Sequence, residues 1–309
     1  MGFQIEEKFV VAVASSALFD LSESDRIFQE RGEEEYRKYQ RENESNTLNT
    51  GVAYPLVRRL LGLNGMTPEE QPVEVVLLSR NDPDTGLRVF KSIEHYDLSI
   101  SRAAFVKGSN PFIYMDAFNA SLFLSANPND VHQAVQKGLP AGQVFPTEFK
   151  DNDEEEVLRI AFDFDGILAD DSAEAVYQEG AIELFHKHEK QKAEEPLPPG
   201  PLMKFLKGLS TLQKIEIAKK ESDENYKPRI RIGIVTARNA PAHERVISTL
   251  RNWGIQVDEA FFLGGINKER VLKVFKPHIF FDDQLGHIEG VARTTPSVHV
   301  PFGVANKEK

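Results

Sequence analysis

The clearest fold signal in the chain is Leu158-Arg159-Ile160-Ala161-Phe162-Asp163-Phe164-Asp165-Gly166. Its first five residues form a mainly apolar run of strand length, and a turn-forming glycine closes the stretch. Asp163 and Asp165 follow at the point where the strand ends. At the carboxyl edge of a parallel sheet, such side chains point into the crevice where α/β folds hold their ligands. The stretch therefore predicts a parallel sheet with two carboxylates at its ligand-binding edge.

Runs of the same kind recur along the chain and alternate with longer segments of helical period. This alternation is typical of an α/β protein with a mostly parallel sheet. Four candidate strands fall in each half of the sequence. They are 10–14, 75–78, 103–106 and 121–124, followed by 158–162, 230–235, 260–263 and 278–281.

The two halves of the sequence align with each other at two fixed offsets. The earlier part aligns at 149 residues and the later part at 157, and a single eight-residue insertion near residues 222–227 explains the difference. Chance matches would not hold two registers over about 100 positions. We therefore predict an internal duplication of one α/β unit. The matched pairs include Phe28 with Tyr177, Tyr36 with Phe185, Gly51 with Gly200, Ser79 with Thr236, Tyr96 with Trp253 and Phe105 with Phe262.

The break between the two copies is expected near residues 146–156. The run 151–156 is polar and mostly acidic, which is typical of an exposed connector. We therefore divide the chain into domains 1–150 and 151–309. In the second domain, an expected core helix over 201–212 leaves only a small helical insert to cover the site.

Composition excludes several classes of function. The chain has 309 residues, a formal net charge of −11 and no cysteine. The acidic balance argues against binding to a nucleic-acid backbone, which requires clustered Lys and Arg. The absence of cysteine excludes disulfides, thiol catalysis and cysteine-ligated metals, and it fits a reducing compartment. An apolar run over 9–19 is too short to span a bilayer, so we expect a cytoplasmic protein that is not bound to a membrane.

The residues that can carry out chemistry lie in the second half. A carboxylate can attack phosphorus, and a second one two residues later can donate and accept the protons. Clustered carboxylates also suit Mg²⁺, while a hydroxyl and an ammonium group suit the phosphate oxygens. The pattern therefore favours phosphoryl transfer. Each expected strand of this half is followed by such a group: Asp163 and Asp165, Thr236, Lys268, and Asp282 with Asp283.

These motifs, in this order, resemble the four motifs of the haloacid dehalogenase-like phosphatase superfamily. The resemblance implies that Asp163 is the nucleophile and a Mg²⁺ ligand. It implies that Asp165 is the general acid/base and gives its backbone carbonyl to the metal. Thr236 and Lys268 would hold the phosphoryl group. Asp282 would be a further metal ligand, with Asp283 supporting or replacing it.

A narrower resemblance covers most of the chain. It rests on the stretches 11–20, His95-Tyr96-Asp97-Leu98, Val235-Thr236-Ala237-Arg238 and His278-Ile279-Phe280-Phe281-Asp282-Asp283-Gln284. These stretches are similar to the cytosolic 5′-nucleotidase I family. The family implies Mg²⁺-dependent hydrolysis of nucleoside 5′-monophosphates, with AMP as the typical substrate.

Several alternatives remain open on the sequence alone. The enzyme could act on another small monoester such as a sugar phosphate, or the chain could be a regulatory protein that binds nucleotide without turnover. Arg238 is a candidate to contact phosphate or base, with an exposed salt bridge as the alternative. His186 and His188 are expected at the surface, because positions i and i+2 face different sides of a helix. A homo-oligomer is compatible with the sequence.

The first half lacks the chemistry of the second. At the registers of the carboxylates and the lysine it has Ala14, Ser16, Pro111, Ser125 and Ala126, and only the hydroxyl of Ser79 remains. A small cap insert next to this inactive copy suggests that the first half supplies a wall against the nucleoside, with stabilisation or an oligomer interface as the alternative. The candidate wall residues are Phe19, Lys107 and Asn110.

Overall fold

A computed structural model describes residues 3–66, 71–172 and 182–306. Eight strands lie where the sequence predicts them, to within two residues at each end. Two further short strands, 141–145 and 297–299, follow the predicted set in each half. The strands are β1 Phe9–Val13, β2 Val73–Ser79, β3 Arg102–Phe105, β4 Phe123–Ser125, β5 Ala141–Phe145, β6 Leu158–Phe162, β7 Ile230–Thr236, β8 Glu259–Phe262, β9 Ile279–Asp282 and β10 Ser297–His299.

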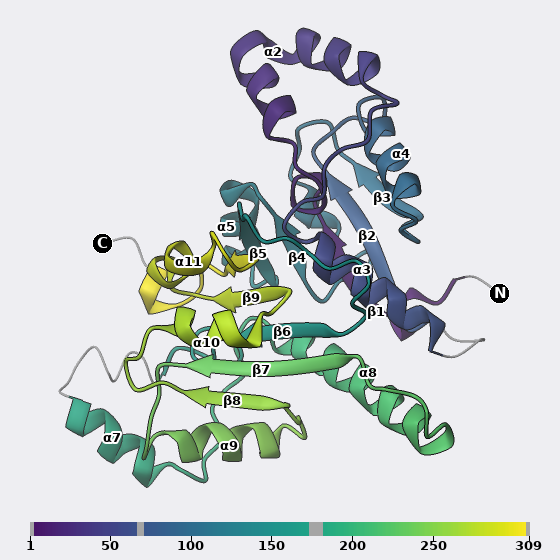
Figure 1. Ribbon diagram of the computed structural model, residues 1–309. Helices are drawn as coiled ribbons and strands as arrows, with labels where there is room; N and C mark the ends of the chain where they lie inside the picture. The colour runs from purple at the N-terminus through teal and green to yellow at the C-terminus, as the bar shows by residue number, and fades with distance from the viewer. Residues whose placement is uncertain (1–2, 67–70, 173–181, 307–309) are drawn as a thin grey trace.

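The described helices connect these strands and cover both faces of the sheet (Figure 1). The expected core helix over 201–212 is part of a longer helix that continues to Ser222. The α-helices are α1 Ser15–Leu18, α2 Ser22–Glu42, α3 Tyr54–Gly62, α4 Leu87–His95, α5 Pro128–Gln136, α7 Ile182–Gln191, α8 Met203–Ser222, α9 His243–Asn252, α10 Lys268–Phe275 and α11 Leu285–Val291. Short 3-10 turns lie at Ile5–Glu7, Leu63–Gly65, Pro111–Tyr114 and Val304–Asn306.

All of the described strands belong to one sheet with the order β3-β2-β1-β4-β5-β10-β9-β6-β7-β8. Within each half the neighbouring strands are parallel, which confirms the predicted α/β class with a mostly parallel sheet. Read outward from the centre, the strand order is β5-β4-β1-β2-β3 in the first half and β10-β9-β6-β7-β8 in the second, so equivalent strands occupy equivalent places. Both halves therefore have the same strand connections.

The pairing register repeats at the offsets found in the sequence. Phe9 pairs with Val73 in the first half, and Leu158 pairs with Ile230 in the second. Phe9 and its equivalent Leu158 are 149 residues apart, and Val73 and its equivalent Ile230 are 157 apart. The helix after the first crossover differs in length, since α8 extends well beyond the equivalent of α3. An insertion in the second half is expected at this place.

The two halves meet through one antiparallel pair, in which Val144 of β5 lies opposite Val298 of β10. This joint reverses the strand direction between the halves, so their carboxyl ends do not share one edge of the sheet. In Figure 1, β7, β8 and β9 point to the left, whereas β2 points upward. The same view shows α2 beyond the strand ends of the first half and α7 beyond those of the second.

The core is continuous on one face of the sheet and divided on the other. Side chains of α3, α4, α8 and α9 pack with both halves of the sheet in a single buried cluster. On the opposite face, α5 covers the first half, and α10 and α11 cover the second, in two separate clusters. No described helix has both the length and the apolar character needed to cross a membrane.

Candidate active site

The ends of β6 and β9 bring two predicted carboxylates to one lysine. Lys268, the first residue of α10, places its Nζ 2.6 Å from Oδ2 of Asp163 and 2.7 Å from Oδ2 of Asp282. All three side chains are buried. The backbone N–H of Phe164 donates to Oδ1 of Asp163 at 2.7 Å, so both oxygens of this carboxylate are held in place.

Asp283 lies beside this group but has a different environment. Its carboxylate packs against the Cα of Gly166, and its buried Oδ1 has no hydrogen-bond partner. His299 Nε2 and Asn306 Nδ2 instead donate to its backbone carbonyl, at 3.0 and 2.8 Å. Burial, and then the charges of Asp163 and Asp282, raise the pKa of Asp283 to about 9. A buried acceptor without a donor is one that a cation could satisfy.

A histidine that the sequence analysis missed completes the group. His287 on α11 places its Nδ1 3.2 Å from Oδ2 of Asp282. Asp163, Asp282 and His287 offer ligand atoms that all lie within 4.8 Å of one another. His287 follows Asp282 by five residues and lies in the first turn of the next helix, and this spacing is the signal that could have revealed it.

Around Lys268, the acidic side chains outnumber the positively charged ones. Burial raises the pKa of Asp163 to about 7 against the opposing effect of Lys268. For Asp282, the lowering effects of Lys268 and His287 outweigh burial, and its pKa falls below the usual value. Burial alone would lower the pKa of Lys268, but the two carboxylates raise it. Three carboxylates around one ammonium group are a hard oxygen set that fits Mg²⁺.

Asp165 and Arg238 form a forked ion pair next to these residues. Nε and Nη2 of Arg238 donate to the two oxygens of Asp165, each at 2.7 Å. The backbone N–H of Arg238 donates to Oγ1 of Thr236 at 3.2 Å, which orients this buried hydroxyl at the end of β7. Arg238 is itself buried, so the alternative of an exposed salt bridge is wrong.

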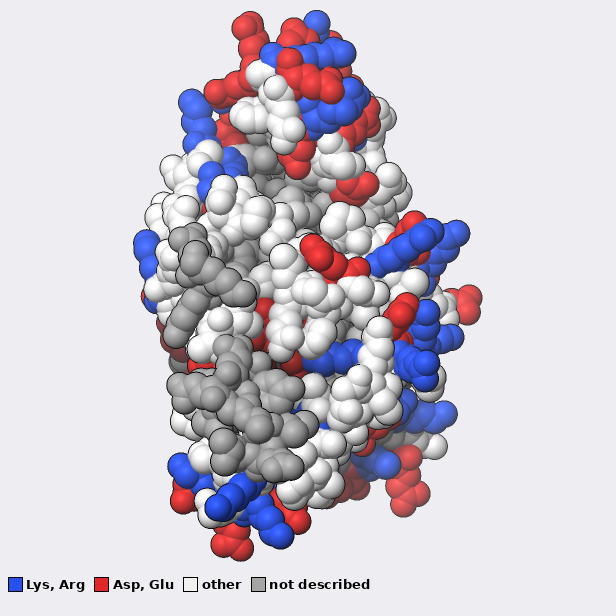
Figure 2. All heavy atoms as spheres, turned by 90° about the vertical axis from the view of Figure 1, so that its left-hand side faces the viewer, with Lys and Arg blue, Asp and Glu red and all other residues white. Residues whose placement is uncertain are grey.

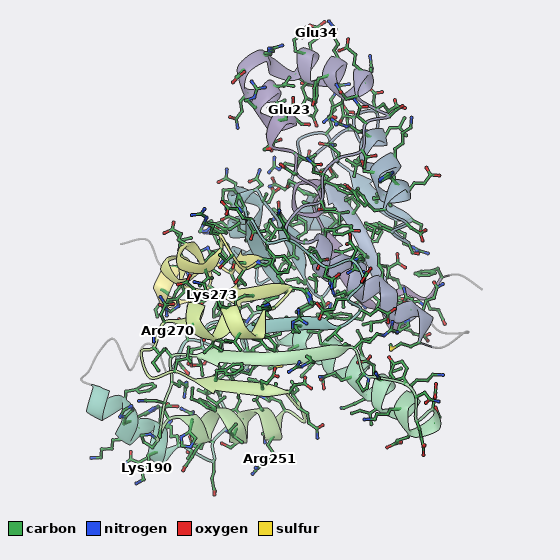
Figure 3. All side chains as sticks on the ribbon, viewed as in Figure 1. Glu23, Glu34, Lys190, Arg251, Arg270 and Lys273 are labelled. Carbon is green, nitrogen blue, oxygen red and sulfur yellow. The ribbon has the colours of Figure 1, made fainter. Side chains whose placement is uncertain are left out.

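Helix α7 contributes a second residue that the sequence analysis missed. Glu189 is fully buried and accepts hydrogen bonds from Arg238 and from Arg245 of α9, the latter at 2.8 Å. Burial alone would raise the pKa of Glu189, but the two guanidinium groups lower it. Lys190, the next residue, points away from the protein in Figure 3. The charged pattern of this helix is typical of a solvated face, which hid the inward-pointing carboxylate of Glu189.

The two histidines of α7 are not simple surface residues. Both are half-buried. Nε2 of His186 lies 3.2 Å from Oδ1 of Asn239, and Nδ1 of His188 lies 3.1 Å from Oε1 of Glu189. The expected surface position is corrected in this respect, because α7 packs against the segment after β7 and against α9.

The candidate wall residues lie in the first half, and two of them border hollows, one of which also reaches Asp151, Asp153 and Pro296 of the second half. Phe19 is fully buried, stacks on Tyr96 with ring centroids 6.0 Å apart, and borders a hollow of about 580 Å³. Lys107 borders another hollow of about 470 Å³. Oδ1 of Asn110 accepts from Arg80 at 2.7 Å. Among the described contacts, none joins these three residues to the Asp163 cluster, because the antiparallel joint turns the two sets of strand ends apart.

Figure 2 shows the face toward which the second half's strands end. Acidic and basic side chains crowd its top, where α2 lies, whereas the described part of the middle is mostly white, with single acidic and basic side chains. A few acidic atoms are seen there, set back between uncharged side chains. A mostly uncharged face around recessed carboxylates suits a small ligand better than a long polyanion.

Comparison with known proteins identifies the family of the chain. The family model described as 5′-nucleotidase matches residues 1–307. Human cytosolic 5′-nucleotidase 1B is 36% identical over 289 residues, which cover 92% of this chain and 47% of that protein. The chain thus spans about half the length of this curated relative, and no solved structure matches it. With residues 1–307 matched by the family model and 36% identity to this relative over 92% of the chain, the chain belongs to the 5′-nucleotidase family.

Proposed function

We propose that the chain is a Mg²⁺-dependent 5′-nucleotidase that hydrolyses AMP-like nucleoside 5′-monophosphates through a phosphorylated Asp163. The observation that carries the proposal is the buried contact of Lys268 with both Asp163 and Asp282 at the ends of two neighbouring strands. Family membership supports the nucleotide as substrate. The cytoplasmic location is proposed on the same basis.

The metal proposal rests on the donor set. Asp163, Asp282 and Asp283 supply carboxylate oxygens, and the backbone carbonyl of Asp165 is the further proposed ligand. The unpartnered Oδ1 of Asp283 is the strongest sign that a cation belongs there. Bound at this set, Mg²⁺ would offset the repulsion between the carboxylates and the phosphate.

In the first step, an oxygen of Asp163 attacks phosphorus and the bond from phosphorus to the nucleoside 5′-oxygen breaks. Asp165 gives a proton to that oxygen, which leaves as the nucleoside. Lys268 and the hydroxyl of Thr236 balance the charge on the equatorial oxygens. The hydrogen bond from Phe164 holds Asp163 in a fixed orientation, so little reorganisation is needed.

In the second step, water attacks phosphorus and gives a proton to Asp165. The bond between phosphorus and the Asp163 oxygen breaks, inorganic phosphate leaves, and both carboxyl groups return to their starting states. One residue thus serves as acid and then as base, which requires a carboxyl group close to the nucleophile. Asp165, two residues after Asp163, meets this requirement.

The proposal is tested by phosphate release from AMP, a sugar monophosphate and p-nitrophenyl phosphate, with Mg²⁺ and with excess chelator. We expect AMP to be preferred and chelator to abolish turnover. Asp163→Asn should lower turnover by at least about 10³-fold, because the amide cannot attack phosphorus. Asp116→Asn, at an exposed position, is the matched control and should retain full activity.

Each rival function has a distinct outcome in the same panel. Preference for the sugar monophosphate would identify another small-molecule phosphatase. Nucleotide binding without phosphate release would identify a regulatory protein. Undiminished activity in Asp163→Asn or in excess chelator would contradict the mechanism.

A further inference from the structure

A buried chain of alternating charges runs from α9, through α7, to the candidate acid/base Asp165. Arg245 of α9 contacts Glu189 of α7, Glu189 contacts Arg238, and Arg238 contacts both oxygens of Asp165. Glu189 and the two arginines are all buried. Alternation of sign lets each buried charge be compensated by its neighbours, which single buried charges are not.

The first half contains an equivalent contact between an arginine and a helix residue, but there the helix residue is neutral. Nη1 of Arg88 donates to Oε1 of Gln40 at 3.2 Å, as Arg245 does to Glu189. Nε of Arg88 donates to the carbonyl of Asn46 at 2.9 Å, and Nε of Arg245 donates to that of Glu195 at the same distance. Gln40 and Arg88 lie at the registers of Glu189 and Arg245. A neutral amide, Gln40 on α2, is therefore sufficient to hold that helix against the first half.

The charged side chains that link this contact to the candidate active site occur only in the catalytic half. At the register of Arg238 the first half has Asn81, and at that of Asp165 it has Ser16. Oδ1 of Asn81 accepts from the hydroxyl of Tyr36, a residue of α2, at 3.2 Å. The carboxylate of Glu189 and the guanidinium of Arg238 thus occur together with Asp165, where anchoring alone does not require them.

Arg238 is held firmly enough to fix its partner. Its guanidinium lies over the rings of Phe164 and Phe185, at 5.7 and 5.6 Å from the ring centroids. With Glu189 on one side and two aromatic faces around it, the fork has a single orientation for Asp165. A carboxyl group that must pass a proton in both directions depends on such orientation.

We propose that Glu189 is a positioning residue, which holds Arg238 so that Arg238 orients the Asp165 carboxyl group for proton transfer. The inference rests on the proposed role of Asp165 as acid and base. It adds that the α7 helix takes part in the reaction through a fixed line of side chains.

A double-mutant cycle between Glu189→Gln and Asp165→Asn tests the proposal. Glutamine is chosen because Gln40, at the equivalent position, keeps the contact to Arg88, the counterpart of Arg245. With AMP, Glu189→Gln should lower kcat about 10- to 100-fold with little change in KM. The loss should be smaller with p-nitrophenyl phosphate, whose leaving group needs less protonation. In the Asp165→Asn background, Glu189→Gln should change the residual rate less than about twofold.

The control is Gln40→Ala, which removes the equivalent helix contact in the first half and should lower the Tm without lowering kcat. Equal losses from Glu189→Gln in both backgrounds would overturn the proposal, as would an unchanged kcat in a folded Glu189→Gln protein. If that variant does not fold, Arg238→Lys takes its place in the cycle, because lysine keeps the charge and loses the fork. Turnover by Asp163→Asn would show that the proposed function itself has failed.

Discussion

Gly166 sits where two loops of the site come closest together. Its φ of +72° is in the left-handed region, and an added Cβ would lie 2.5 Å from Oδ2 of Asp283. A residue with a side chain would therefore push the Asp283 carboxylate out of the cluster. The glycine fixes the distance between the loop after β6 and the loop after β9.

We expect Gly166→Ala to lower both stability and activity. The left-handed backbone alone costs alanine about 1 kcal/mol, and the clash adds about 1–3 kcal/mol. Gly138→Ala is the matched control, since Gly138 has a φ of +75° and no atom near the added Cβ. Both variants should lose stability in denaturant titrations, but only Gly166→Ala should lose phosphatase activity. Equal activity in the two variants would show that Asp283 is not needed.

At the scale of single residues, the sequence predicted the carboxylates and Lys268 because each lies at the end of a strand or in the loop that follows one. Order and spacing are visible in a sequence, and the sheet edge brings such residues together. Glu189 and His287 were missed because their roles depend on which side of a helix is buried. That is decided by packing against α9 and β9, which local patterns do not show.

At the scale of elements, the predicted strands were those with long apolar runs. β5 and β10 were missed because polar residues such as Gln143 and His299 interrupt their apolar patterns. Each pairs with a strand of its own half and also with the other across more than 150 residues of sequence, which no local pattern records. The alternating strand and helix pattern was nevertheless sufficient to predict the fold class.

The segment leading into β9 contains a buried histidine that should make stability depend on pH. Nδ1 of His278 accepts a hydrogen bond from the backbone N–H of Arg159 at 3.0 Å. Burial, and then the positive charges of Arg59 and Arg159, lower the pKa of His278 to about 3. The neutral form is thus favoured in the folded protein. Its stabilising contribution is complete above the unfolded pKa of about 6.5 and is lost as the pH falls toward 3.

We expect this loss to appear as a difference between the wild type and His278→Asn, because asparagine cannot take up a proton there. Between pH 6.5 and 4.5, the free energy of unfolding of the wild type should fall by about 2 kcal/mol more than that of the variant. Urea titrations at a series of pH values measure the difference, and other titrating groups cancel in it. Parallel pH profiles would contradict the assignment.

At the scale of the whole molecule, the joint between β5 and β10 decides how the two halves can cooperate. The parallel strands of each half direct their carboxyl ends to that half's own ligand edge. The predicted wall required these edges to face each other, which a sequence alignment cannot establish. The repeat was visible in the sequence, but the direction in which its copies join was not.

We therefore expect the first half to contribute stability and no substrate contact. Lys107→Ala, at an exposed position, should leave kcat/KM unchanged within about twofold for both AMP and p-nitrophenyl phosphate. Steady-state assays with the two substrates measure the ratio. A selective loss with AMP would place Lys107 in the substrate site and restore the wall.

The same joint has a consequence for fragments of the chain. A cut near residue 150 would leave β5 as an open edge on one piece and β10 on the other, each with unpaired backbone groups. An unpaired strand edge pairs with any available strand, so each fragment alone should self-associate. The same cut would expose to water the buried apolar cluster that the two halves share beneath α3 and α8. Co-expressed, however, each fragment offers the strand that the other lacks, and complementation between 1–150 and 151–309 should rebuild an active enzyme from two pieces.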